Sequence, residues 1–98
     1  MHARVSHISG SPENADQGIE AFRSNTLPEL KSQDGNRGAI LLIDRASGAG
    51  MAITLWEDEA AMQSSEEWAN EARRSASEQM GAGGQARVER YEVAAFET

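Results

Sequence analysis

The chain is 98 residues long, and we expect residues 1–98 to form a single domain. Hydrophobic residues make up 39% of it, but 16 of them are alanines, so the core is thin and burial against a second subunit would help it. A net charge of −7 argues against nucleic-acid binding, which normally requires a basic stripe. The sequence shows no apolar run of about 20 residues and no secretory signal, so we expect a cytoplasmic protein with no membrane partner.

The N-terminal part predicts a strand followed by a helix. Residues 3–8 are compatible with a short strand. A helix should begin at Ser11, whose hydroxyl can accept a hydrogen bond from a free backbone N–H, with Pro12 at its first position. Its apolar stripe consists of Ile19, Phe22, Thr26, Leu27 and Leu30. We expect Pro28 to kink or divide this helix near residue 27.

The middle of the chain predicts a hairpin of two strands. Residues 37–44 are apolar without alternation, which is typical of a strand covered on both faces. A glycine-containing turn at residues 47–50 leads into a second strand at residues 51–56.

A second long helix and a last strand complete the chain. The helix should begin at Asp58 and end at the glycine-rich residues 81–84. The last strand is expected at residues 86–96.

The order of these elements, β-α-β-β-α-β, predicts an α+β fold of the ferredoxin-like class. Right-handed crossovers give a four-stranded antiparallel sheet with both helices on one face. Alternate residues of the strand at 37–44 point to opposite faces, so one of two apolar pairs stays uncovered by helices. These pairs are Ile40 with Leu42 and Leu41 with Ile43. An exposed apolar sheet face favours a homodimer in which two sheets pack face to face.

Three segments carry a resemblance to a known family: residues 36–44 (NRGAILLID), 53–62 (ITLWEDEAAM) and 90–93 (RYEV). Together they resemble the antibiotic biosynthesis monooxygenase (ABM) superfamily of dimeric α+β barrels. In that superfamily a strand ends in a tryptophan that is followed by an acidic, small and apolar helix start. The resemblance covers nearly the whole chain, and it implies the dimeric barrel fold.

The resemblance implies several uses of the fold. One branch of the superfamily oxidises polycyclic phenols to quinones with O2 and without metal or flavin. It has an asparagine four residues before the strand-end tryptophan and a tyrosine six residues after it, where this chain has Ala52 and Met62. A second branch degrades haem with a first-strand asparagine and a histidine on the second helix. This chain has His7 at approximately the first position and no histidine at the second, which argues against haem degradation.

Five residues are candidates for a site. Trp56, Met62 and Trp68 would wall a small apolar ligand pocket, although a place in the core is the simpler explanation for each. His7 and Tyr91 are candidates for proton transfer, although a strand histidine and a half-buried strand tyrosine need no functional explanation. With two histidines and no cysteine, we expect no bound metal and no cofactor.

Two functional hypotheses follow. The chain is a cofactor-independent monooxygenase that acts on an aromatic or polyketide-like metabolite, or it is a non-catalytic ligand-binding or interaction protein of the same fold. An enclosed cavity at Trp56, lined by His7 or Tyr91, would favour the enzyme. A space filled by Trp56, Trp68 and Met62 would favour the binding protein.

Overall fold

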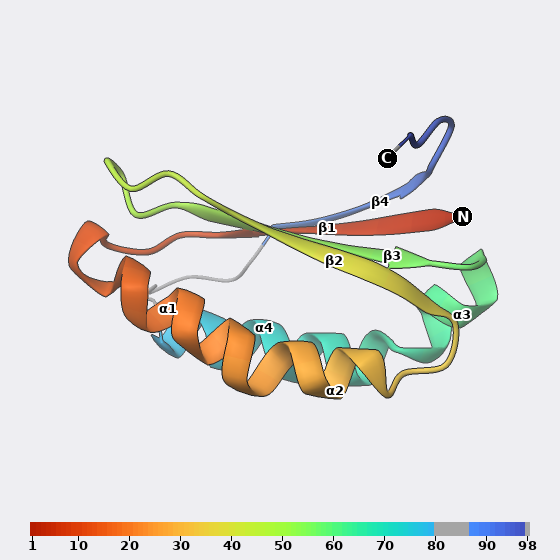
Figure 1. Cartoon of the computed structure of the whole chain (residues 1–98), viewed down its shortest axis with the longest axis horizontal. Coiled ribbons are helices and arrows are strands. Elements are labelled where there is room, and N and C mark those ends of the chain that lie inside the picture. Colours follow the sequence, from red (N-terminus) through yellow and green to blue (C-terminus); the bar gives the residue numbers. More distant parts are fainter. Residues whose placement is uncertain (80–86, 98) are drawn as a thin grey trace.

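The computed structural model describes residues 1–79 and 87–97. Its strands form a four-stranded antiparallel sheet in the order β2-β3-β1-β4, which confirms the predicted ferredoxin-like topology. The bounds of the strands are β1 His2–Ile8, β2 Asn36–Ile43, β3 Gly50–Trp56 and β4 Arg87–Glu92. All helices lie on one face of the sheet, so the described part of the chain has two layers (Figure 1).

The first helical segment runs beside β2 and contains three kinds of turn. Their bounds are η1 Pro12–Asn14 (3-10), α1 Ala15–Ala21, η2 Phe22–Thr26 (π) and α2 Leu27–Lys31. The π turn closes with a hydrogen bond from the Leu27 N–H to the Phe22 carbonyl, directly before Pro28. A proline has no N–H with which to continue an α-helical ladder, and the wider turn divides the helix at that point.

The start of this segment differs from the prediction. Ser11 does precede the first helical turn, but its hydroxyl makes no capping bond to a backbone N–H. Its Oγ accepts instead from the side-chain amide of Asn14 at 2.8 Å, while the backbone N–H of Asn14 donates to the Ser11 carbonyl at 3.0 Å. The turn is therefore closed by the backbone and by a second side chain.

The second helical segment is two helices rather than one, α3 Glu59–Ser64 and α4 Glu66–Gln79. Asp58 caps α3 as expected and accepts a hydrogen bond from the Ala61 N–H at 2.8 Å. The helix breaks at Ser65 because the Ser65 hydroxyl donates to the Met62 carbonyl at 2.8 Å, a local bond that competes with the helical ladder.

The last strand is shorter than predicted. It ends at Glu92, and the bond from the Val93 N–H to the Met1 carbonyl at 2.8 Å is the last that ties it to β1. The glycine-rich stop predicted at residues 81–84 lies outside the described residues.

The two faces of the sheet have different surroundings. Leu30, Trp56 and Met62 form the core between the sheet and the helices. On the opposite face Ile40 and Leu42 remain 43% and 49% exposed. The apolar pair that the helices leave uncovered is therefore Ile40 with Leu42.

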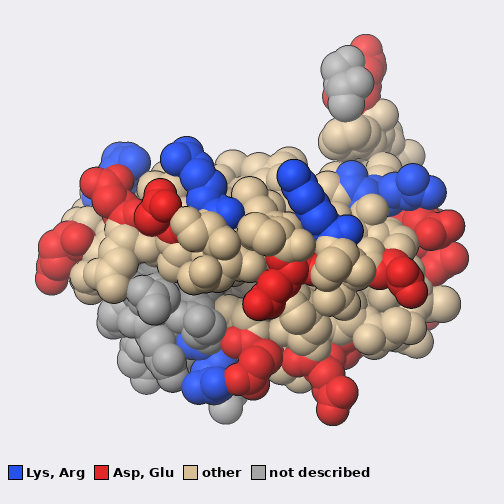
Figure 2. All heavy atoms as spheres, turned by 60° about the horizontal axis from the view of Figure 1, so that its bottom comes forward, with Lys and Arg blue, Asp and Glu red and all other residues tan. Residues whose placement is uncertain are grey.

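On the helix side, acidic and basic side chains are interspersed and form no stripe of one sign among the described residues (Figure 2). No helix within residues 1–79 and 87–97 has the length and apolar character needed to cross a membrane.

Candidate functional site

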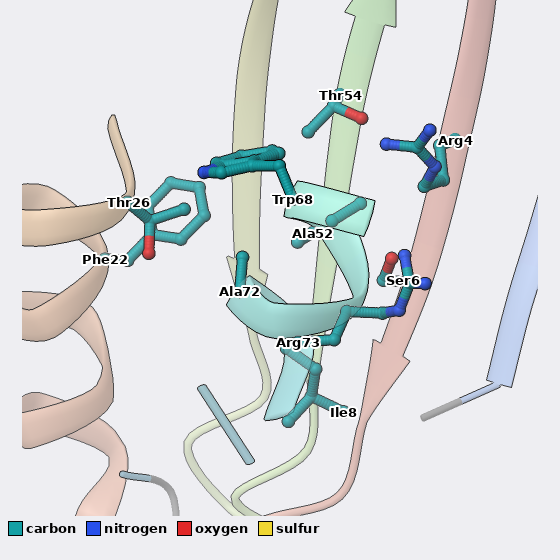
Figure 3. Close-up of a pocket in the computed structure, with 11 residues that line it drawn as sticks. Arg4, Ser6, Ile8, Phe22, Thr26, Ala52, Thr54, Trp68, Ala72 and Arg73 are labelled. Atoms are coloured by element: carbon teal, nitrogen blue, oxygen red, sulfur yellow. The ribbon is translucent and has the colours of Figure 1, made fainter. Parts of the chain in front are cut away.

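A cavity lies between the helix-facing side of the sheet and helix α4 (Figure 3). It contains about 420 Å³ of space free of atoms, part of it open to solvent. The centre of a water molecule can occupy about 40 Å³ of this space. The lining residues come from β1, η2, β3 and α4: Arg4, Ser6, Ile8, Phe22, Thr26, Ala52, Thr54, Trp68, Ala69, Ala72 and Arg73.

Strand and helix periodicity explain which side chains reach the cavity. Successive side chains of a strand alternate between its faces, so the even-numbered residues of β1 and β3 all turn towards the helices. Ala52 on β3 and Ala69 and Ala72 on α4 are small, and their size leaves the space open. Trp68 forms part of the wall and is held by a hydrogen bond from its Nε1–H to Glu29 Oε2, of 2.9 Å.

Arg4 is the main polar group of the cavity and is only 1% exposed. Its Nη2 donates to the Met62 carbonyl at 2.5 Å and to Ser65 Oγ at 3.0 Å, and it lies 3.2 Å from a carboxylate oxygen of Glu66. Its Nε and Nη1 are buried and have no hydrogen-bond partner. Burial lowers the pKa of the Arg4 guanidinium, and the Glu66 carboxylate acts in the opposite direction.

Arg73 brings a second guanidinium to the same cavity from α4. Its Nη2 donates to Asn70 Oδ1, whereas its Nη1 is buried and has no partner. Burial is the largest cause that lowers the pKa of Arg73, and the positive charge of Arg4 lowers it further. Because an arginine side chain stays protonated in proteins, the cavity is bordered by two cations.

Of the three residues predicted to wall a pocket, the structure places Trp68 on this cavity and the other two in the core. Trp56 is 0% exposed, packs with Met62, and donates from Nε1 to Thr54 Oγ1 at 2.9 Å. Met62 is 2% exposed. Trp56 therefore supports the cavity from behind Thr54 and does not line it.

His7 and Tyr91 lie on the opposite face of the sheet, because His7 is at an odd position of β1 and Tyr91 pairs with Ala3 in the register of β4. Both side chains contact the carboxylate of Glu89. His7 Nε2 lies 2.6 Å from Glu89 Oε1, and the Tyr91 hydroxyl donates to Glu89 Oε2 at 3.0 Å. The hydrogen bond to Glu89 raises the pKa of Tyr91. Neither residue reaches the cavity.

Arg4 and Arg73 are not among the site residues expected from the sequence. Strand alternation puts Arg4 on one face with Ser6 and Ile8, but the sequence does not say that the helices cover this face. Among the described residues, no group of three or more metal-ligating side chains lies together.

Comparison with known proteins places this geometry in a family. Over 96 residues the chain is 37% identical to the Mycobacterium tuberculosis protein named uncharacterized protein Rv2557 (strain ATCC 25618 / H37Rv). The match covers 98% of this chain but 42% of that relative, so the chain spans less than half of its length.

Solved structures show the same fold. The monooxygenase from the gene ActVA-Orf6 of Streptomyces coelicolor, solved in complex with the ligand nanaomycin D, superposes with a TM-score of 0.77 at 16% identity, covering 99% of this chain and 91% of that one. SnoaB, a cofactor-independent oxygenase from Streptomyces nogalater, gives 0.62 at 17% identity, covering 99% and 94%. The family model described as antibiotic biosynthesis monooxygenase matches residues 1–70, and the chain belongs to this family.

Proposed function

We propose that the chain binds a small aromatic or polyketide-like metabolite in the cavity between sheet and α4 and oxygenates it without a cofactor. One observation carries the proposal: the cavity combines aromatic and aliphatic walls with two guanidinium groups that have free N–H donors. A flat ligand would stack against Trp68 and Phe22 and place an oxygen atom near Arg4. Both aromatic side chains are half-buried and line the cavity.

The arrangement suits oxygenation of an acidic phenol or enol. A positive charge near a bound phenol favours its ionised form, and the ionised form is electron-rich enough to react with O2. Oxygen adds to a ring-linked CH2 carbon to give a hydroperoxide, which loses water and leaves a carbonyl group. One oxygen atom thus enters the product, the other leaves as water, and the substrate carbon supplies the electrons. The apolar walls exclude bulk water from this step.

A second candidate function, ligand binding without chemistry, is favoured by a different observation. The residues that line the cavity include no histidine, aspartate or glutamate. A substrate that does not ionise by itself would therefore find no carboxylate or imidazole there to accept its proton. Ala52 and Met62, which stand where the phenol-oxidising branch has polar residues, agree with this alternative.

The proposal includes a homodimer that buries the uncovered sheet face. Ile40 and Leu42 are exposed on β2, and Tyr91 is 52% exposed on the same face of β4. β2 and β4 are the two edge strands of the sheet, and exposed apolar side chains on one sheet face favour association of two copies by a two-fold axis.

Oxygen uptake with dithranol, a tricyclic phenol that oxidises to an anthraquinone, tests the two functions. The enzyme hypothesis predicts O2 consumption above the rate without protein, lost in Trp68→Ala and retained in Glu67→Ala, whose exposed side chain precedes Trp68. Binding in a titration without added O2 consumption would support the second function. If dithranol and other flat phenols neither bind nor consume O2, the cavity is not a site for phenols.

A further inference from the structure

We infer that Arg4 and Arg73 form an oxyanion site, so that the natural ligand of the cavity carries a carboxylate or an ionised phenol or enol oxygen. This inference rests on the proposed function, because it assigns the chemical class of the ligand to the same cavity. The evidence for it is the set of hydrogen bonds that the two guanidinium groups make and the charged groups around them.

The hydrogen bonds of Arg4 leave part of its binding capacity unused. All three of its contacts to Met62, Ser65 and Glu66 are made by Nη2. The N–H groups on Nε and Nη1 have no partner, although the side chain is almost completely buried. A buried N–H of a cation without a partner is costly, and natural proteins rarely keep one unless water, an ion or a ligand uses it.

The carboxylate nearest to Arg4 is already committed to another arginine. Glu66 accepts hydrogen bonds from Arg90 Nε at 2.7 Å and from Arg90 Nη2 at 3.0 Å, in addition to its contact with Arg4. The two guanidinium groups that line the cavity, Arg4 and Arg73, therefore have beside them one carboxylate that is shared with Arg90, in a chain whose net charge is −7. The cavity is therefore lined by positive charge in a chain that is negative overall.

The other acidic group beside the cavity does not neutralise this charge. Glu29 lies on α2 and accepts the hydrogen bond from Trp68 Nε1, and no ion pair joins it to Arg4 or Arg73 among the described residues. Burial is the largest cause that lowers the pKa of Arg73 and the charge of Arg4 lowers it further, while the single carboxylate of Glu66 acts in the opposite direction. A ligand oxyanion would supply the missing charge and the missing hydrogen-bond acceptors.

Calorimetric titration with 2-naphthoate and its neutral isostere 2-naphthamide tests this site. The two probes share one ring system and differ in charge. We expect the naphthoate to bind at least tenfold more tightly to the natural protein, and Arg73→Gln to remove about that tenfold advantage without weakening naphthamide. Arg74→Gln is the matched control, because Arg74 is the next residue on α4 and its side chain pairs with Glu71.

A third probe identifies the source of the oxyanion. If the site ionises a phenol, then 2-naphthol should show the absorbance of its anion when bound near neutral pH, and Arg73→Gln should abolish that spectrum. Naphthoate binding without ionised naphthol would instead assign the site to carboxylates. Equal binding of naphthoate and naphthamide would overturn the oxyanion site and leave the ligand cavity intact, whereas failure of all three probes to bind would overturn both.

Discussion

The guanidinium carbon of Arg4 lies 5.5 Å from the centre of the Trp56 ring. This cation–π contact joins the most deeply buried aromatic residue of the core to the main polar group of the cavity. Thr54, which accepts the hydrogen bond from Trp56, stands beside Arg4 in the cavity wall. The packing of the core and the position of the cation therefore depend on one another.

We expect Trp56→Ala to lower the stability of the folded protein. The side chain is fully buried against Leu30 and Met62, and removing so large a core residue costs about 3–5 kcal/mol of the free energy of unfolding. Trp56→Phe keeps most of the volume but loses the bond to Thr54, at a cost of about 1 kcal/mol. Urea denaturation measures both. A stable Trp56→Ala variant that has lost ligand binding would place Trp56 in the site after all.

Glu66 should make the protein less stable in acid. Hydrogen bonding to Arg90 is the largest cause that lowers its pKa in the folded protein, and the charge of Arg4 adds to it. A lowered folded-state pKa stabilises the protein above the unfolded value of about 4.3, and this contribution is lost as the pH falls through the folded pKa. We therefore expect Glu66→Gln to flatten the fall in stability between about pH 5 and about pH 3.

Chemical denaturation at several pH values measures that slope. Glu67→Gln is the control, since Glu67 is exposed and adjacent on α4. The remaining slope in Glu66→Gln belongs in part to Glu89, whose pKa is also lowered, first by its hydrogen bond with His7. A slope as steep in Glu66→Gln as in the unaltered protein would show that its ion pairs do not stabilise the fold.

The sequence was sufficient to predict the element order and the sheet, because hydrophobic periodicity and turn residues are local signals. The sequence offers two candidates for the apolar pair that the helices leave uncovered. Identifying that pair as Ile40 and Leu42 needs the register of β2 against β3. The break at Ser65 depends on a hydroxyl whose partners include Arg4, 61 residues away, which no local pattern reveals.

The site was less predictable than the fold. In the sequence, Trp56 fits a predicted strand and Trp68 fits a predicted helix, and nothing else distinguishes their roles. Only the three-dimensional packing shows that Trp56 lies in the core and that Trp68 lines the cavity. The chemistry of His7 and Tyr91 is that of a site, but the register of β1 and β4 places both on the sheet face opposite the helices. Arg4 lacks unusual neighbours in the sequence, and its importance comes from burial and unpaired N–H groups.

Asp58→Ala should destabilise the protein by about 1 kcal/mol, because Asp58 caps α3 through its bond to the Ala61 N–H. Asp58→Asn keeps an acceptor oxygen and should cost little. Urea denaturation of the two variants separates the capping bond from the charge. An equal loss in both would assign the effect to the negative charge near the helix start rather than to the hydrogen bond.

Leu42→Lys should dissociate the proposed homodimer. Leu42 lies at the exposed apolar face of β2 opposite Met51, and a lysine at a two-fold sheet interface would bring two cations into apolar surroundings. In sedimentation equilibrium we expect twice the monomer mass for the unaltered protein and the monomer mass for the variant. Gln63→Lys, on the exposed surface of α3, should stay dimeric. An unaltered protein that remains a monomer at every concentration would contradict the dimer and leave Ile40 and Leu42 without a partner subunit.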